Sequence, residues 1–356
     1  MHSQAGPAVT NFVPSLPKVE LHVHLEGTLR PETFVELARK YAVPLPAGTA
    51  SELRQVLSTV QGSSFFGAYS AMGMCLNAAE DFERVTYEYG AEMARQNIRY
   101  AEVHINLAFH RARGVDSDVC FAGANLGRDR AHEDFGVEVS WIVGVMRAPR
   151  LDSASRMRAA EFSLAAAIEG RDHGVVALGL GGEEVEGDVA TFAPLFERAK
   201  AGGLHVVPHA GELAGPANVA AAVDLLGAER IAHGVRAVED AELVRRLANA
   251  GVCLDVCLTS NVRLNVFPDM QRHPMRALMD QGVALTLSTD DPGVLGVDLN
   301  HELDAAMNAL SLRPTDIERL QLQAIHSSFL SPGRKEVLAA ELSAESQRIR
   351  VRQSMP

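Results

Sequence analysis

Short apolar segments alternate along the chain with longer amphipathic ones. Eight of the short segments are rich in valine, isoleucine and leucine and lead into a glycine, polar or charged residue, which is typical of buried β-strands. They span residues 18–25, 100–107, 138–145, 174–181, 204–211, 230–235, 251–258 and 283–290. Apolar residues spaced by three and four, with a glycine near the end, predict helices at 192–203, 217–229 and 240–252.

Alternating strands and helices, with eight strands in all, predict an α/β fold, specifically a parallel (β/α)8 barrel of the TIM type. The alternative is an open doubly wound sheet, but the glycine-rich GxGxxG turn is absent after the first strand. The interval between the first two strands is longer than one helix needs. We therefore expect a single barrel domain, 1–356, with a helical lid insertion at about 30–98 over the C-terminal mouth.

Composition narrows the range of partners. The 356 residues are 47% hydrophobic and 22% charged, with a formal net charge of −12. This charge disfavours general binding to nucleic acid or to an anionic membrane, because both need clustered Lys and Arg. A small-molecule partner is expected, and monomer and homo-oligomer stay open. No leader-like pattern precedes Pro17 and no apolar run could span a bilayer, which predicts a cytoplasmic location. Four scattered cysteines do not suggest a disulfide framework.

The first strand, "KVELHVHL", carries two histidines two residues apart. Side chains of a strand alternate between its faces, so one face should be apolar and the other polar. The apolar face would hold Val19, Leu21, Val23 and Leu25, and the polar face would hold Glu20, His22 and His24. Two imidazoles on one face can reach one ion, so the strand predicts a packing face and a metal-binding face.

Ionisable side chains also stand at the ends of three later strands. In a barrel the C-terminal strand ends meet at one mouth, where active sites lie. These ends supply His209 and Glu212 in "HAGE", His233 in "IAHG", and Asp290 and Asp291 in "STDDP". Imidazoles and a carboxylate at one mouth predict a divalent metal site, with zinc the preferred ion. The fourth strand has no lysine that could bridge two metals, so one ion is expected.

Each motif alone has an ordinary explanation. Histidines in a strand can be core residues, and an Asp pair before proline can be a turn or a helix N-cap. Together, and in this order, "LPKVELHVHLEGTLRPETF", "GLGGEE", "HAGE", "ERIAHGVRAVED", "CLTSN", "STDDP" and "HSSFL" make nearly the whole chain resemble the adenosine and adenine deaminase family of the amidohydrolase superfamily. The resemblance implies one zinc ion held by His22, His24, His209 and Asp290.

The resemblance also implies a reaction. Hydroxide formed from water at the zinc would attack C6 of an aminopurine while Glu212 protonates ring N1, a role that a buried, protonated carboxyl suits. His233 would lie beside the attacking water. The remaining residues would contact the substrate, with Asp291 on the N7 side, the backbone of Gly182 near N3, and His24 facing the ring.

The identity of the purine depends on Glu26. Adenosine-specific members usually carry Asp there to contact the ribose, so Glu26 either reaches a sugar hydroxyl or fills the space of the sugar. "HLEGTL" and "HGVRAVED" favour adenine or N6-substituted adenine, whereas "GLGGEE", "ELRQVL" and "SSFL" favour adenosine. We expect adenosine and 2'-deoxyadenosine, converted to the inosine form and ammonia, with adenine or N6-substituted adenine as the alternative. The family's "CP" is replaced by Cys257-Leu258, which alters the pocket floor.

Two other function classes are compatible with parts of this pattern. An amide or ester hydrolase would share the barrel and the paired histidines, but it has no need for an acid that protonates a ring, the part expected of Glu212. A non-catalytic binding protein would have lost a metal ligand or the acid, and every position is filled here. Aminopurine deamination is therefore the prediction.

Overall fold

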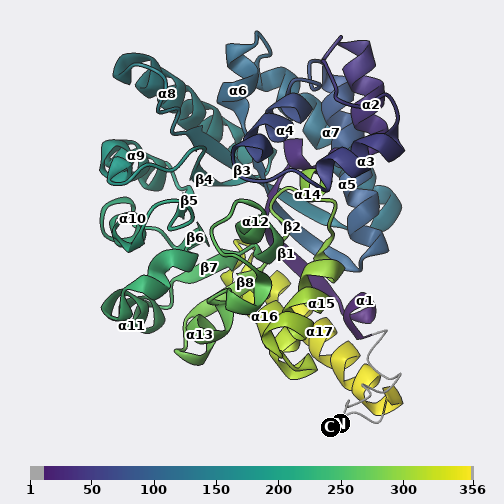
Figure 1. Cartoon of the computed structure of the whole chain (residues 1–356), viewed down its shortest axis with the longest axis vertical. Coiled ribbons are helices and arrows are strands. Elements are labelled where there is room, and N and C mark those ends of the chain that lie inside the picture. The colour runs from purple at the N-terminus through teal and green to yellow at the C-terminus, as the bar shows by residue number, and fades with distance from the viewer. Residues whose placement is uncertain (1–11, 354–356) are drawn as a thin grey trace.

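Eight parallel strands form a nearly closed barrel at the centre of the molecule (Figure 1). The computed structural model describes residues 12–353, so residues 1–11 and 354–356 of the predicted 1–356 domain, and most of the N-terminal stretch before Pro17, lie outside the described part. The strands are β1 (Lys18–His24), β2 (Ile98–Ile105), β3 (Glu138–Met146), β4 (Val175–Gly181), β5 (His205–Ala210), β6 (Arg230–His233), β7 (Cys253–Val256) and β8 (Ala284–Leu287). They pair in sequence order, which confirms the predicted barrel.

The barrel closes between β1 and β8 by main-chain hydrogen bonds at the ends that carry the predicted ligands. The His24 amide donates to the Asp290 carbonyl at 2.8 Å, and the Asp290 amide donates to the His22 carbonyl at 3.1 Å. Every residue of the short strands β6 and β7 is buried, as expected when helices cover the outside of a parallel barrel.

The regular alternation predicted for β1 does not run through the strand. Its pairing with β2 shifts register between Glu20 and Val23, and such a bulge re-aims the side chains around it. Glu20 accepts hydrogen bonds from Tyr89 of the outer helix α5 (Ala79–Arg95) and from Thr289. The expectation that Glu20 shares the metal-binding face of His22 is therefore wrong.

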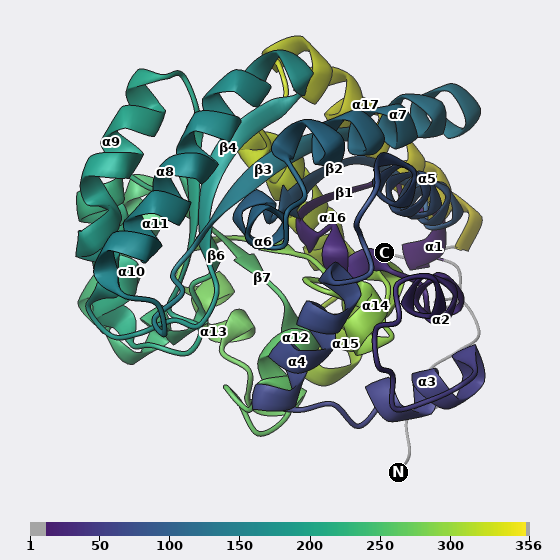
Figure 2. The same ribbon diagram turned by 90° about the horizontal axis from the view of Figure 1, so that it is seen from above.

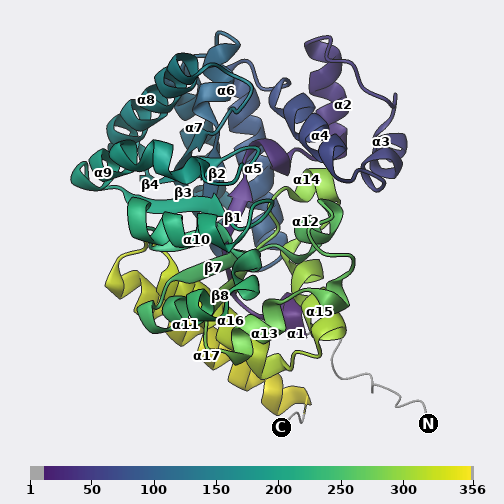
Figure 3. The ribbon, with the colours of Figure 1, turned by 60° about the vertical axis from the view of Figure 1, so that its left-hand side comes forward.

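Helices surround the barrel on its outer side (Figures 1 and 3). Besides α5, the α-helices of the described residues are α1 (Phe12–Ser15), α2 (Pro31–Lys40), α3 (Ala50–Leu57), α4 (Ser63–Gly73), α6 (Leu107–Ala112), α7 (Ser117–Phe135), α8 (Ser153–Glu169), α9 (Ala193–Ala201), α10 (Pro216–Ala221), α11 (Ala241–Ala250), α12 (Leu258–Arg263), α13 (Met275–Asp280), α14 (Pro292–Leu295), α15 (Leu299–Leu310), α16 (Pro314–Ser327) and α17 (Pro332–Gln353). The helix predicted at 217–229 ends in a π-helical turn, Ala222–Leu226.

The interval 30–98 contains helices of two kinds. Helix α5 packs along α7 on the outside of the barrel. Helices α2, α3 and α4 lie together on one side of the molecule in Figures 2 and 3, and α4 contributes to the wall of the central cavity. Helix α3 begins where the sequence dictates it, because Thr49 and Glu52 form a reciprocal capping box.

Two further observations concern the chain as a whole. Among residues 12–353, no helix combines the length and apolar character needed to cross a membrane. The four cysteines are buried and free, as the sequence predicted.

Candidate active site

A cavity of about 750 Å³ opens at the C-terminal ends of the strands. Its wall brings together side chains that lie far apart in the sequence, including His24, His209, His233, Asp290 and Asp291. Glu212 and the backbone of Gly182 also reach it, whereas His22 is fully buried beneath it. The barrel thus gathers most of the predicted residues at one mouth.

Four donor atoms at the base of this cavity have the spacing of metal ligands. His209 Nε2 lies 3.1 Å from His22 Nε2 and 3.3 Å from His24 Nε2. Asp290 Oδ1 lies 3.4 Å and 3.3 Å from the same two nitrogens. Ligands about 2.0–2.1 Å from a tetrahedral ion are about 3.3–3.4 Å from one another. Three imidazoles and one carboxylate at these distances fit a single divalent ion.

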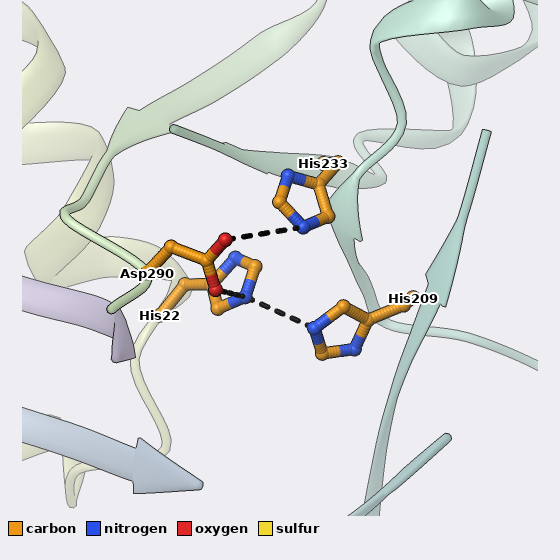
Figure 4. A group of neighbouring side chains, drawn as sticks. All are labelled: His22, His209, His233 and Asp290. Carbon is orange, nitrogen blue, oxygen red and sulfur yellow. Dashed lines mark hydrogen bonds and ion pairs between the residues drawn. The ribbon is translucent and has the colours of Figure 1, made fainter. Parts of the chain in front are cut away.

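His233 faces His22, His209 and Asp290 from β6, and one donor atom of each of these four side chains lies within 4.8 Å of the others (Figure 4). Its Nε2 is 3.9 Å from Asp290 Oδ2 and 3.3 Å from Glu212 Oε1. Asp290 and His233 both have a positive φ, 64° and 65°, a backbone conformation that costs about 1–3 kcal/mol and is found at functional sites. Both side chains line the cavity.

The hydrogen bonds behind the ligands hold them in place. His22 Nδ1 lies 3.2 Å from the Asp255 carbonyl, and Ser260 donates to Asp290 Oδ2 at 2.6 Å. Arg147, at the end of β3, donates to the carbonyl of His209 at 2.6 Å. Such outer contacts orient metal ligands. No sequence motif pointed to Arg147, although its position two residues after the predicted strand 138–145 was a usable signal.

The charges of the cluster are strongly shifted by burial and by one another. Burial opposes ionisation of Asp290, but hydrogen bonds from His22 and His24 hold its pKa well below the ordinary value. Burial and the neighbouring imidazoles lower the pKa of His209 well below its ordinary value. Neutral imidazole and ionised carboxylate are the forms that bind metal.

The surroundings of Glu212 favour its acid form. Its carboxyl lies beside His233 and accepts a hydrogen bond from the Asn261 amide at 3.4 Å. Burial, with the negative charges of Asp290 and Glu184, raises the pKa of Glu212 well above its ordinary value. A protonated carboxyl at this position is equipped to donate a proton.

Glu184, which no sequence motif marked as a functional residue, holds the loop that carries Glu212. Glu184 accepts hydrogen bonds from the main-chain amides of residues 211–214 at 2.8–3.0 Å. It also accepts one from the Asn218 side chain at 3.1 Å. The second glutamate of "GLGGEE" thus fixes the turn on which the proton donor sits.

Asp291 is another side chain of the cavity wall. Its Oδ1 is buried and has no hydrogen-bond partner within the described residues. Burial, together with the charges of Asp290 and Glu26, raises the pKa of Asp291 well above its ordinary value. Gly27 makes room for it, because a Cβ at that position would lie 1.9 Å from Asp291 Oδ1. The site therefore holds an unused polar group of the kind that recognises a ligand.

Glu26 lies elsewhere than the sequence predicted. Its side chain is fully buried and is not part of the cavity wall. One carboxylate oxygen accepts from the Asn106 amide at 2.9 Å and faces His110 at 3.0 Å, and the other accepts from Tyr69 at 3.1 Å. Three protein partners hold the carboxylate away from the cavity wall, so this geometry gives no support to the predicted contact between Glu26 and the substrate. Glu26 instead supports α4 through Tyr69.

The cavity wall also contains residues that the sequence motifs did not identify. His104, at the end of β2, stacks on His24 with ring centroids 4.8 Å apart, and its Nε2 has no partner in the part of the chain described. The strand-end reasoning used for His22 would have found it in "YAEVHINL". Phe65 and Phe66 of α4 also line the cavity.

Comparisons with known proteins agree with this geometry. An adenine deaminase from Cupriavidus taiwanensis is 38% identical over 94% of this chain and 93% of its own length. An aminodeoxyfutalosine deaminase from Streptomyces avermitilis is 33% identical over 96% of this chain and 94% of its own. The solved structure of an amidohydrolase from Burkholderia ambifaria with bound Zn has a TM-score of 0.88 and 25% identity, covering 99% of this chain and 97% of that one.

Fold and site define a metal-dependent amidohydrolase barrel. Residues 17–345 match the adenosine deaminase family, and the chain belongs to that family. It is a hydrolytic deaminase of adenine-like aminopurines. The expectation of adenosine as the substrate fits less well than its alternative, because the relatives carry the names adenine deaminase and aminodeoxyfutalosine deaminase.

Proposed function

We propose that this chain is a zinc-dependent adenine deaminase, which converts adenine and water to hypoxanthine and ammonia. The observation that carries the proposal is the buried Glu212, whose raised pKa favours its protonated form, beside four donor atoms with metal-ligand spacing. His22, His24, His209 and Asp290 would hold the ion. A bound zinc ion lowers the pKa of a coordinated water enough to supply hydroxide near neutral pH.

The side chains then have distinct roles. Adenine would lie with C6 toward the metal-ligand cluster and N1 toward Glu212, which delivers its proton to N1 as oxygen adds to C6. His233, whose Nε2 lies 3.3 Å from Glu212 Oε1, would stabilise the charge that develops as oxygen adds to C6. Asp291, whose raised pKa favours the protonated form, would donate to N7, and the backbone of Gly182, with φ at +88°, would approach N3. His24 faces the same cavity.

A second candidate is an adenine that carries a substituent at N9. The cavity volume of about 750 Å³ is in the range of sites for drug-sized ligands and exceeds what a bare base needs. Apolar side chains on its wall, including Phe65, Phe66, Phe109 and Leu151, could pack against such a group. The name of the Streptomyces avermitilis relative, aminodeoxyfutalosine deaminase, also supports this candidate.

The test is the change in ultraviolet absorbance of zinc-loaded enzyme with adenine, N6-methyladenine, adenosine, 2'-deoxyadenosine and aminodeoxyfutalosine. Turnover of adenine with a kcat/KM at least a hundredfold above that of the nucleosides is the expected result. Turnover of an N9-substituted compound with adenine inert would replace the first candidate by the second. A small purine as sole partner and a cytoplasmic location remain predictions of the sequence.

A further inference from the structure

A chain of hydrogen bonds runs from the protein interior to the back of His233. The Met275 main-chain amide donates to His273 Nδ1 at 3.2 Å, and His273 Nε2 lies 3.1 Å from Asn261 Oδ1. Asn261 Nδ2 in turn lies 3.2 Å from His233 Nδ1. The three side chains are almost completely buried, and neither Asn261 nor His273 belongs to the cavity wall. We call these three side chains with the Met275 amide the His273 relay.

The direction of the first bond is fixed by chemistry. A main-chain amide can only donate, so His273 Nδ1 must accept. Burial lowers the pKa of His273 to about 3, so the ring is neutral near pH 7 and carries one proton. That proton is therefore on Nε2, which donates to Asn261.

The donor on His273 fixes the orientation of the Asn261 side-chain amide. Only its carbonyl oxygen can accept from His273, which turns its amide nitrogen toward His233. The same nitrogen lies 3.4 Å from Glu212 Oε1, which fits an amide donor to that oxygen. Because the Asn261 amide donates, His233 Nδ1 accepts, which leaves Nε2 as the ring nitrogen that carries the proton.

We propose that Asn261 and His273 are positioning residues that fix His233 as its Nε2-protonated tautomer, so that His233 meets the reacting groups as a hydrogen-bond donor. Its Nε2 faces two oxygens, as a donor would: Glu212 Oε1 at 3.3 Å, and Asp290 Oδ2 at 3.9 Å (Figure 4). The inference deepens the proposed function and rests on it. It assigns His233 to charge stabilisation rather than to uptake of a proton at Nε2.

The direct test is ¹⁵N NMR of the histidine rings in the zinc-loaded enzyme, with His233 assigned by comparison with His233→Gln. The expected spectrum has a protonated Nε2 and an unprotonated Nδ1. Asn261→Asp should invert this pattern, because a carboxylate can only accept and would draw the proton to Nδ1. A wild-type ring protonated at Nδ1, or an unchanged ring in Asn261→Asp, would overturn the proposal.

Kinetics supply the second test. His273→Phe removes the relay, and kcat should fall about tenfold to a hundredfold with KM changed less than about twofold, as for loss of outer contacts at other sites. His273→Gln keeps an acceptor for Met275 and a donor for Asn261, so it should restore most of kcat. His132→Gln, an exposed histidine of α7, is the matched control.

These results separate the two proposals. Equal losses in His273→Phe and His273→Gln, or full kcat in His273→Phe, would refute the relay. The NMR measurement needs no substrate. If none of the purines is turned over and His233 still carries its proton on Nε2, the proposed function fails and the tautomer assignment stands.

Discussion

His24 and Asp290 are joined twice. The His24 amide donates to the Asp290 carbonyl at 2.8 Å, which closes the barrel between its first and last strands, and His24 Nε2 lies 3.3 Å from Asp290 Oδ1, one edge of the candidate metal site. The same contact therefore completes the fold and sets the spacing of two ligands. Metal affinity should be coupled to the integrity of the barrel at this seam.

The first prediction concerns the ligands. His24→Ala should lose its zinc, because it removes an imidazole whose Nε2 lies 3.3 Å from both His209 Nε2 and Asp290 Oδ1. Elemental analysis of purified protein measures this, and His132→Ala, which changes an exposed histidine, should retain one ion per chain. A fully loaded His24→Ala protein would contradict the ligand assignment.

Glu212→Gln tests the proton donor. The variant keeps the size of the side chain but has no acidic proton, so kcat should fall about a hundredfold to ten-thousandfold while zinc content stays unchanged. Steady-state kinetics on the preferred purine measure the loss. Glu197→Gln, an exposed substitution on α9, is the control, and near-normal turnover by Glu212→Gln would remove Glu212 from the reaction.

Glu184→Gln should act through Glu212. An amide cannot accept from every donor that now meets the Glu184 carboxylate, so the loop loosens and kcat should fall about tenfold. The charge of Glu184 also helps to raise the pKa of Glu212. Because the reaction needs protonated Glu212, kcat should decline as pH rises through this pKa, and the decline should move to lower pH in Glu184→Gln. A pH profile of kcat with an unshifted basic limb would show that Glu184 has no influence on the acid.

Glu26→Gln should not discriminate between bases and nucleosides. Glu26 lies outside the cavity wall and supports Tyr69 and Asn106, so its loss should loosen the wall for every ligand. KM, or the inhibition constant of a purine that is not turned over, should rise by similar factors for adenine and adenosine. Selective weakening of adenosine would restore the sugar contact that the sequence suggested.

Glu302 should give the folded protein a distinct dependence on pH. Burial raises its pKa from 4.5 to about 7. A raised pKa contributes stability that is fully present below the unfolded-state value and is lost as pH rises through the folded-state value. Between about pH 4.5 and 7 the wild type should lose up to about 3 kcal/mol that Glu302→Gln does not lose. Urea unfolding of both zinc-loaded proteins at pH 5 and 7.5 measures the difference, and parallel curves would refute it.

The sequence by itself determined the barrel, because the periods of strands and helices are local properties of the chain. The eight strands lie where apolar runs predicted them, and His209, His233 and Asp290 meet because barrel strands end at one mouth. The local sequence pattern was enough to predict a residue's place in the site wherever that place depends only on its position along a strand.

Tertiary structure alone decided what each polar side chain contacts. The bulge in β1 turned Glu20 toward α5, and the donors around Glu26 removed it from the cavity. The hydrogen bonds of Glu184 and of the His273 relay join residues from separate loops, so no spacing in the sequence predicts them. A hydrogen bond depends on tenths of an ångström between atoms of distant segments, and packing of the whole barrel sets those distances.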